Sequence, residues 1–384
     1  MRIYFYVKVF PPNGKPLDRG ISKAVDGLAD GLQECGVKVT IFCEGDRDSY
    51  CQTDKGVEIR CFANKLKNDK LFFVSNKLKL YIEQYPSDLV ILNAVFHPSV
   101  YVLSRFLKKL QIPYLACPHD PYHPSIFSKN AHLKWPYWYL LESSMLRQAK
   151  AIQVLDIRHG EFLRRLRIKT PVIEVPNGFH PEDVLPESKL QWRKNSPPKL
   201  LFLGRIDYYN KGLDLLLEAF AQIVIEKNID AHLTIQGPDW GDRKMLEKKG
   251  EKLGISEKLS FLKPDFRVSP SSIIINYDIF CLPSRFEGFG LSALEAMLAG
   301  RVLLVSEVGG IAPHVSLSGC GVVVKSEIVS IKNGLEKLLE CRSEWQEMGM
   351  AGRRYVLENL HWQQIASTAL EEYKQILASS NMSK

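Results

Sequence analysis

Two basic residues in the second half of the chain have the types and spacing that suit a diphosphate. Arg205 follows the apolar run 199–203, and Lys211 precedes a helical pattern that begins near Leu213. Backbone N–H groups and the dipole at a helix start favour an anion. A guanidinium and an ammonium there would add charge-assisted hydrogen bonds. Either residue alone would be an ordinary surface charge, but together with Gly204 and Gly212, which permit close approach, they predict a binding site.

A glycine-rich turn between two acids marks a second candidate. Glu287 comes directly before Gly288-Phe289-Gly290, and Glu295 lies further along the same segment. The N–H groups of this turn, and of a helix starting at Leu291, can hold a phosphate or a sugar hydroxyl. The two acids converge only if Glu287 lies in a loop and Glu295 in the first turns of the helix. A structural alternative stays open for Glu295, because Ser292 and Glu295 also satisfy a capping box.

The elements that must position these residues alternate between strand and helix patterns. In the first half we expect strands near 2–9, 37–43, 88–93, 112–117, 150–154 and 172–175, and helices near 20–35, 71–84, 98–110, 131–148 and 156–167. In the second half we expect strands at 199–203, 232–236, 258–262, 278–282, 302–305 and 321–324, and helices at 213–227, 291–299, 331–341 and 344–357. The alternation predicts an α/β fold with two doubly wound parallel-sheet domains facing each other across a cleft.

Composition sets the boundaries of these domains. We expect a first Rossmann-like domain over 1–175, a polar, proline-containing linker over 176–198 and a second Rossmann-like domain over 199–360. The final helical pattern, 361–384, could pack back on the first domain. Because ligands bind beyond the carboxyl ends of strands in such sheets, the polar residues at those ends are the candidates for function.

The charge of the chain is distributed unevenly. Its 384 residues contain 51 Lys and Arg against 43 Asp and Glu, a net charge of +8. Residues 1–180 hold 26 basic and 17 acidic side chains, which is +9, so the rest of the chain holds 25 and 26, which is −1. The excess predicts that the first half faces an anionic partner, with a solvated face kept for solubility as the alternative.

Cysteine spacing and hydropathy exclude several classes of protein. The 8 Cys include no CxxC pair, so a zinc site or redox dithiol is not expected. The first apolar run is broken by Lys8, and no stretch reaches the ~20 apolar residues of a membrane span. We therefore expect a reduced, cytoplasmic protein that is soluble or peripherally bound to the inner face of a membrane.

The motifs together resemble the retaining family 4 glycosyltransferases, also called glycosyl transferases group 1, which have the GT-B fold. The resemblance rests on Arg205 with Lys211, on Glu287 with Glu295, and on the segments Leu304-Val-Ser306-Glu-Val-Gly309-Gly310 and Val175-Pro-Asn-Gly178. It is specific over about 175–375 and looser before that. It implies transfer of a hexose from a UDP- or GDP-sugar, with retention of configuration, to a hydroxyl of a glycan, lipid-linked or small-molecule acceptor.

The resemblance also implies residue roles. Arg205 and Lys211 would bind the donor diphosphate, Glu287 the transferred sugar and Glu295 the ribose hydroxyls. Further donor contacts would come from Gly237, from Leu262 near the nucleobase, and from the N–H groups of Phe289, Gly290 and Leu291. The first domain would bind the acceptor and the second the donor.

The first domain contributes weaker candidates. Gly20, before the first helix, fits the position of the family's phosphate-approaching loop but lacks a glycine pair, so an ordinary turn glycine is an equal alternative. His119 follows the strand near 112–117 and resembles the family residue that contacts the sugar. Asp120 could orient that ring or position an acceptor hydroxyl. His97 is a secondary candidate. Aromatic and basic residues over 122–139 also suit an anionic membrane surface.

Other readings of the sequence remain. Asp46-Arg-Asp48 matches a metal-binding DxD, but it falls in a polar loop, and we expect no required metal or cofactor. A nucleotide-sugar epimerase of similar fold, or a non-catalytic binder of anionic ligands, would use similar residues. A nucleic-acid-binding protein is not expected, because no zinc-finger or RNP signature is present.

Overall fold

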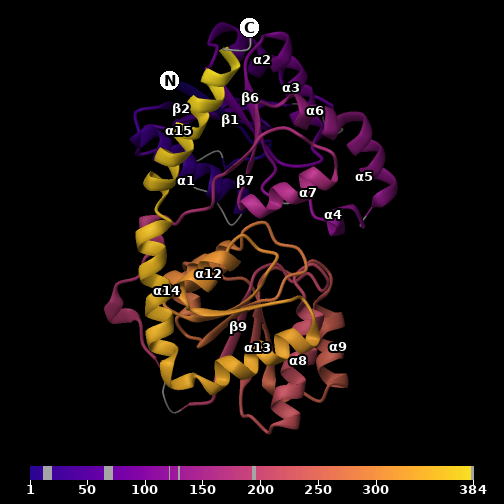
Figure 1. Cartoon of the computed structure of the whole chain (residues 1–384), viewed down its shortest axis with the longest axis vertical. Helices are drawn as coiled ribbons and strands as arrows, with labels where there is room; N and C mark the ends of the chain where they lie inside the picture. Colours follow the sequence, from indigo (N-terminus) through magenta and orange to yellow (C-terminus); the bar gives the residue numbers. More distant parts are fainter. Residues whose placement is uncertain (12–19, 65–71, 121, 129, 193–195, 382–384) are drawn as a thin grey trace. The chain divides into compact units, whose positions relative to one another are not determined.

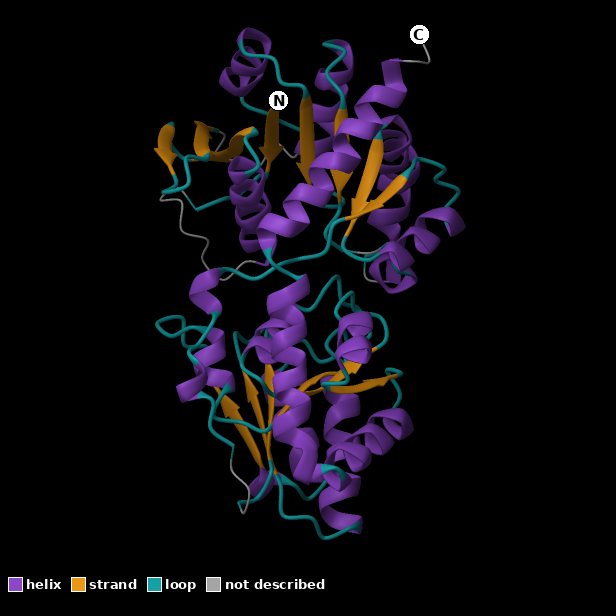
Figure 2. Cartoon of the chain, turned by 60° about the vertical axis from the view of Figure 1, so that its left-hand side comes forward, coloured by secondary structure: helices purple, strands orange, loops and turns teal. Residues whose placement is uncertain are grey.

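The chain folds into two compact units, which we describe from a computed structural model. The structure describes residues 1–11, 20–64, 72–120, 122–128, 130–192 and 196–381. The first unit comprises Met1–Gly178 and Trp362–Lys384, and the second comprises Phe179–His361. Each unit has a sheet covered by helices (Figures 1 and 2), so the expectation of two parallel-sheet α/β domains is confirmed.

The sheet of the first unit has the order β3-β4-β2-β1-β5-β6-β7-β8. All neighbours are parallel except the hairpin formed by β3 and β4. The strands are β1 (Arg2–Tyr6), β2 (Lys38–Gly45), β3 (Ser49–Gln52), β4 (Glu58–Ala63), β5 (Leu89–Asn93), β6 (Tyr114–Cys117), β7 (Ala151–Val154) and β8 (Val172–Glu174). Its order reverses between β1 and β5, which is where doubly wound sheets bind ligands.

Helices cover both faces of this sheet. They are α1 (Gly20–Glu34), α2 (Asn76–Gln84), α3 (Pro98–Lys109), α4 (Pro124–Ser128), α5 (Ala131–Tyr137), the π-helical turn η1 (Trp138–Glu142), α6 (Ser143–Gln148), the short 3₁₀ turn η2 (Ile157–His159), α7 (Gly160–Arg165) and α15 (Trp362–Asn381). The central strands β1, β2, β5, β6 and β7 are largely apolar and buried, as expected for a parallel sheet covered on both sides.

The sheet of the second unit has the order β11-β10-β9-β12-β13-β14, with all neighbours parallel. Its strands are β9 (Lys199–Leu203), β10 (His232–Gln236), β11 (Leu259–Leu262), β12 (Ile279–Leu282), β13 (Val302–Ser306) and β14 (Gly321–Val324). Its helices are α8 (Leu213–Glu226), α9 (Arg243–Lys252), α10 (Pro270–Ile274), α11 (Leu291–Leu298), α12 (Ala312–Ser318), α13 (Ile328–Glu340) and α14 (Trp345–Asn359), with 3₁₀ turns η3 (Pro181–Asp183), η4 (Glu187–Lys189), η5 (Ser256–Lys258) and η6 (Arg342–Glu344). The order reverses between β9 and β12.

Several elements differ from the sequence expectations. The edge hairpin of β3 and β4 was not expected, because its strands are short, half polar and joined by a turn that places Gly56 at φ 90°. Helices α9, α10 and α12 were also not expected. In α9 only Leu246 and Gly250 are buried, so the apolar periodicity is too weak to indicate a helix.

The segment expected as a linker packs within the second unit from Phe179 onward. Phe179 and Leu185 are buried. Arg353 donates to the carbonyl of Leu185 at 2.5 Å, and Arg301 donates to that of Gln191 at 3.0 Å. Charged hydrogen bonds to backbone carbonyls therefore attach this polar segment to the second unit.

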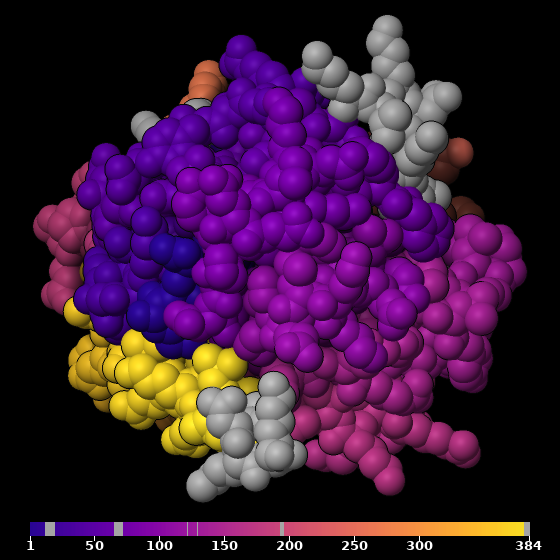
Figure 3. Space-filling view, turned by 90° about the horizontal axis from the view of Figure 1, so that it is seen from above, coloured from indigo at the N-terminus to yellow at the C-terminus, as the bar shows by residue number. Residues whose placement is uncertain are grey.

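The final helix packs against α1 in the first unit (Figure 1). Figure 3 shows its yellow surface beside the indigo residues of the chain's start. A Cβ on Gly27 would lie 2.1 Å from the indole nitrogen of Trp362, so only glycine permits this approach. Tyr373 extends the contact by donating to the side-chain oxygen of Gln153 at 2.6 Å.

In the part of the chain that the structure describes, no helix has the length and hydropathy needed to cross a bilayer. The eight cysteines are all free thiols.

A buried carboxyl group in the first unit provides a test of its packing. Glu142 is buried and accepts hydrogen bonds from the Tyr122 hydroxyl at 2.6 Å and from the Phe96 N–H at 3.0 Å. Burial raises the pKa of Glu142 to about 7. The folded state therefore binds a proton more tightly than the unfolded state, and this contribution to stability is lost as the pH rises toward and through 7.

We expect Glu142→Gln to become more stable than the parent as the pH rises, because the amide keeps an acceptor oxygen without ionising. The two proteins should be about equal at pH 5, and the variant should gain about 2 kcal/mol by pH 8. Urea unfolding at both pH values measures this, with the exposed Glu161→Gln as the control. An equal difference at both pH values would contradict the prediction.

Candidate active site

The reversal point of the second sheet brings two loops together. One loop joins β9 to α8 and contains Arg205 and Lys211, and the other joins β12 to α11 and contains Glu287. Because β9 and β12 are parallel neighbours, their carboxyl ends meet at the same edge of the sheet. Residues far apart in the sequence are thus placed side by side.

Lys211 and Glu287 form an ion pair at this edge. The ammonium lies 2.7 Å from Oε2 of Glu287, and each side chain is only 14% exposed. The hydroxyl of Ser284 donates to the same oxygen at 3.1 Å. Ser284 is itself held by Ser326, which donates to its carbonyl at 2.7 Å. The cation and the anion are therefore positioned by each other, and the Ser284 hydroxyl supplies a further hydrogen bond to Glu287.

Backbone and charged hydrogen bonds join the two loops. The N–H groups of Arg285 and Phe286 donate to the carbonyl of Asn210 at 2.9 and 3.2 Å. The Arg285 guanidinium also binds Asp214 through two parallel bonds of 2.6 and 2.7 Å, and these hydrogen bonds raise the pKa of Arg285. Sequence reasoning assigned no role to Arg285, Asp214 or Asn210, since local sequence does not show which distant residues these polar groups contact.

Gly212 permits the close contact between the loops. It adopts φ 64°, and a Cβ there would lie 2.2 Å from the carbonyl oxygen of Pro283. Both the left-handed conformation and the lack of space require glycine. The close approach expected from the sequence at this position is therefore made to the protein's own backbone.

Arg205, in the same β9–α8 loop as Lys211, is an exposed cation. Its guanidinium carbon is 4.3 Å from the ring centre of Trp240, in a cation–π contact. Trp240 follows β10, and its N–H donates to the Ile206 carbonyl at 3.4 Å. Arg205 is exposed, so an arriving anion can reach it. Trp240 was missed from the sequence, because nothing there indicates that it meets Arg205.

The glycine-rich turn forms the start of α11. Gly290 is the N-cap at φ 100°, and Leu291 is the first helical residue, so the first N–H groups point out of the helix toward the same edge. The turn is held from behind by the N–H groups of Gly310 and Ile311, which donate to Gly288 and Phe289 at 3.0 and 2.9 Å. Such a turn suits a phosphate or a hydroxyl.

Glu295 lies in α11 and is buried. The helix begins with Gly290 as its cap and places Ser292 inside the first turn, so the capping box considered for Ser292 and Glu295 does not form.

Gly237 follows β10 and donates to the Leu262 carbonyl at 3.2 Å, and the Leu262 side chain is 42% exposed. Gly237 and Leu262 therefore lie at the same carboxyl edge of the second sheet, on the side of β10 and β11.

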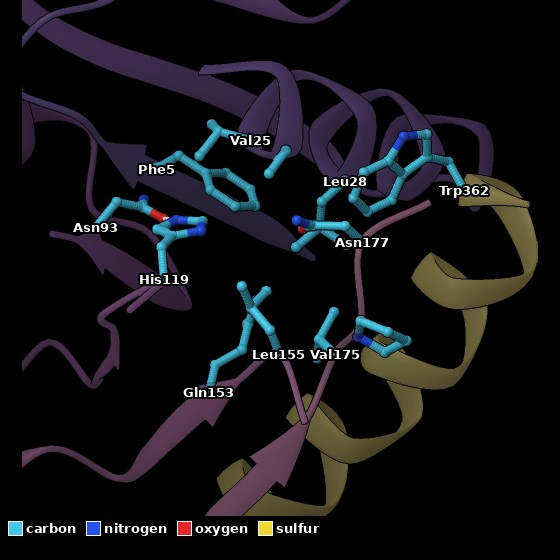
Figure 4. Close-up of a pocket in the computed structure, with 12 residues that line it drawn as sticks. Phe5, Val25, Leu28, Asn93, His119, Gln153, Leu155, Val175, Asn177 and Trp362 are labelled. Carbon is cyan, nitrogen blue, oxygen red and sulfur yellow. Dashed lines mark hydrogen bonds between the residues drawn. The ribbon is translucent and has the colours of Figure 1, made fainter. Parts of the chain in front are cut away.

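In the first unit, His119 lines a pocket beside the reversal point of that sheet (Figure 4). The ring lies 2.8 Å from the side-chain oxygen of Asn93, the last residue of β5. Burial lowers the pKa of His119 to about 4, so the imidazole is neutral near pH 7. Asn93 was missed, although its place at the end of an apolar run is a usable signal.

The other candidates of the first unit are more scattered. Asp120 is partly buried directly after His119. His97 caps α3 and contacts the hydroxyl of Ser99 at 3.0 Å. Gly20 is the exposed first residue of α1, but the rest of the loop expected to approach phosphates, 12–19, lies outside the described residues.

One acid of the DxD sequence, Asp48, makes structural contacts. Asp48 accepts from the Ala63 N–H at 2.7 Å and pairs with Lys77. Among the described residues, no group of three or more His, Cys, Asp or Glu side chains could hold a metal ion.

Comparisons with known proteins agree with this architecture. The family model "Glycosyltransferase Family 4" matches residues 19–183, and "Glycosyl transferases group 1" matches residues 186–355. The MMP alpha-(1->4)-mannosyltransferase of Mycolicibacterium hassiacum is 26% identical over 182 residues, 47% of this chain and 44% of the relative. The phosphatidyl-myo-inositol mannosyltransferase of Mycobacterium tuberculosis is 25% identical over 213 residues, 54% and 55% of the two chains. The chain therefore spans about half the length of the curated relatives it matches.

Solved structures match over almost the whole chain. Sucrose-phosphate synthase from Thermosynechococcus elongatus superposes with a TM-score of 0.77 at 19% identity, covering 98% of this chain and 99% of the other. An Anabaena protein, HepE, in complex with UDP and glucose gives 0.71 at 16% identity, covering 98% and 100%. At these identities the likeness shows the fold alone. With the two family models together matching most of the chain, the protein belongs to glycosyltransferase family 4, and its architecture is the GT-B fold.

Proposed function

We propose that the protein is a retaining, metal-independent hexosyltransferase that uses a UDP- or GDP-sugar as donor. Its acceptor would be a hydroxyl of a glycan, a lipid-linked molecule or a small molecule. The observation that carries this proposal is the Lys211–Glu287 pair beside the α11 N-terminus, at the reversal point of the second sheet. The names of the relatives support a sugar donor, since two are mannosyltransferases.

The chemistry requires the departing diphosphate to be stabilised. Glycosyl transfer passes through an oxocarbenium-like transition state, in which negative charge grows on the leaving phosphate. Lys211 and Arg205 would neutralise that charge, and the N–H groups of Phe289, Gly290 and Leu291 would donate to the phosphate and to the sugar. The exposed position of Arg205 supports this role, because its contact with Trp240 leaves hydrogen-bond donors available to a ligand.

The carboxylates would bind hydroxyl groups. Glu287 would hold the transferred sugar, and its pairing with Lys211 fixes its orientation before the donor arrives. Glu295 would hold the ribose, and Gly237 and Leu262 would border the nucleobase. In the first unit, His119 would hydrogen-bond a substrate hydroxyl and Asp120 would help position the acceptor, while Gly20 would lie near the phosphates. If the leaving phosphate itself accepts the acceptor's proton, no protein base is needed.

A donor panel tests this function directly. UDP- and GDP-hexoses are incubated with the protein in a chelating buffer, with and without a cell lipid and glycan extract. We expect nucleotide diphosphate release that depends on the acceptor extract, and a product that keeps the donor's anomeric configuration by NMR. An epimerase would instead convert the donor without releasing nucleotide, and a requirement for added metal would contradict metal independence.

Substitutions at the ion pair test the assignment of residues. We expect Lys211→Ala and Glu287→Gln each to lower kcat/KM by about a hundredfold or more, the first because it removes a donor to the leaving phosphate and the second because it removes the negative charge that would accept from the sugar hydroxyls. Glu287→Gln keeps an oxygen to accept from Lys211 and should retain its Tm. The matched control is Lys332→Ala, which removes an exposed pair with Glu226 of 2.7 Å in the same unit. Near-normal turnover in both site variants would overturn the assignment.

We also propose that the first unit contacts an anionic membrane. An apolar strip on α5 and η1 is exposed, with Leu133 62%, Trp135 36%, Tyr139 70% and Leu140 72% exposed. Trp135 stacks on Tyr139 with ring centres 5.8 Å apart. The stretch of sequence that contains this strip, residues 101–170, holds 12 basic and 4 acidic residues. Aromatic and basic side chains together favour the surface of an anionic bilayer.

Vesicle sedimentation checks the membrane contact. We expect binding to phosphatidylglycerol vesicles but not to phosphatidylcholine vesicles, and a loss of about tenfold in the partition coefficient when Tyr139 and Leu140 are both changed to Ser. Leu80→Ser, at a site on α2 that is 62% exposed, is the matched control. Equal binding by the double variant and the parent would place the contact elsewhere.

A further inference from the structure

The pocket of the first unit contains two polar side chains that contact each other. It lies beyond β5 and β6, and Figure 4 shows the His119 ring beside Asn93, below Phe5. Its remaining walls are largely apolar and include Val25, Leu28, Leu155 and Trp362, together with the amide side chains of Gln153 and Asn177. In an apolar pocket, the direction of each polar hydrogen bond decides what ligand atom can be accepted.

The orientation of the Asn93 amide is determined by the backbone around it. Asn93 is 1% exposed. Its side-chain nitrogen donates to the carbonyl oxygens of Tyr6 and Ile91, each at 3.2 Å. Turning the amide would place an oxygen against two carbonyl oxygens, which repel it. The side-chain oxygen is therefore the atom directed at His119.

This orientation determines which nitrogen of His119 carries the hydrogen. The Nε2 atom lies 2.8 Å from the Asn93 side-chain oxygen, and an amide oxygen can only accept. Nε2 must then be the donor. The thiol sulfur of Cys117 lies 3.5 Å from the same nitrogen, a longer and weaker contact. Because burial keeps the imidazole neutral near pH 7, the second nitrogen, Nδ1, has a free electron pair.

The backbone at His119 is bent to make this contact. His119 adopts φ 60°, a left-handed conformation that is uncommon for a residue other than glycine. The turn comes two residues after β6 ends and directs the ring toward the last residue of β5. A backbone conformation of this kind at a strand end is typical of functional positions.

We propose that Asn93 is a positioning residue that holds His119 as the Nε2–H tautomer, so that Nδ1 accepts a hydrogen bond from a substrate hydroxyl. The hydroxyl belongs to the transferred sugar or to the acceptor, and in this respect the inference rests on the proposed function. His119 then binds substrate as an acceptor and does not act as a proton donor. A ligand that lacks the hydroxyl, or presents a carbonyl there, is rejected.

The tautomer is measured by NMR, independently of any activity. Long-range ¹H–¹⁵N spectra of protein labelled with [¹⁵N]histidine distinguish the two tautomers, and the spectrum of His119→Gln identifies the signals of His119 among the 9 histidines. We expect the Nε2–H form in the parent and in Cys117→Ala, the matched control at the same nitrogen. We expect a mixture of both forms in Asn93→Ala. An Nδ1–H form in the parent, or an unchanged tautomer in Asn93→Ala, overturns the proposal.

Activity with the best donor of the panel tests the acceptor role. We expect kcat/KM to fall by about tenfold in Asn93→Ala, as the loss of one hydrogen bond does. His119→Asn puts an amide oxygen near the place of Nδ1, whereas His119→Gln puts it near Nε2, so the first should retain more activity. Equal loss in both His119 variants overturns the acceptor role. Failure of the parent to transfer any sugar would count against the proposed function, while the NMR result would still decide the tautomer.

Discussion

The contact between the β9–α8 loop and the β12–α11 loop is the constraint on which the candidate active site depends. Asn210 offers one carbonyl to two N–H groups of the second loop, and the Arg285–Asp214 pair adds two charged hydrogen bonds. Gly212 lets the backbones approach. Lys211 and Glu287 are direct neighbours of these contacts in the sequence, so their ion pair follows from the geometry of the loops.

Both units bring polar residues together through a reversal of the strand order in a parallel sheet. In each sheet the strand order reverses beside the first strand. The reversal lies between β1 and β5 in the first unit and between β9 and β12 in the second. In each, polar residues at or just beyond the carboxyl ends of strands near the reversal point are brought together. They are Asn93 and His119 in the first unit, and Lys211 and Glu287 in the second. The first contact is between a neutral amide and a neutral imidazole, and the second is between two charged groups, so the two sites differ in electrostatics.

Much of the fold could be predicted from the sequence. Apolar runs indicated most of the strands, because strands buried on both faces consist mainly of apolar residues. The exceptions were elements with weak apolar patterns, namely the β3–β4 hairpin and the charged helix α9. The segment after Phe179 has a linker-like composition, yet Arg353 and Arg301 attach it to the second unit. Composition alone contains no information on distant hydrogen-bond partners.

For the candidate site, the sequence by itself determined which residue types stand at strand ends and helix starts. Arg205, Lys211, Glu287 and His119 were predicted in this way, because the carboxyl edge of a parallel sheet is set by the strand pattern. Only the tertiary structure decided their partners. The pairing of Lys211 with Glu287, the stacking of Arg205 on Trp240 and the amide of Asn93 against His119 all join separate segments. Such contacts depend on the order of the strands in the sheet and on the conformations of the loops. Local residue spacing determines neither of these.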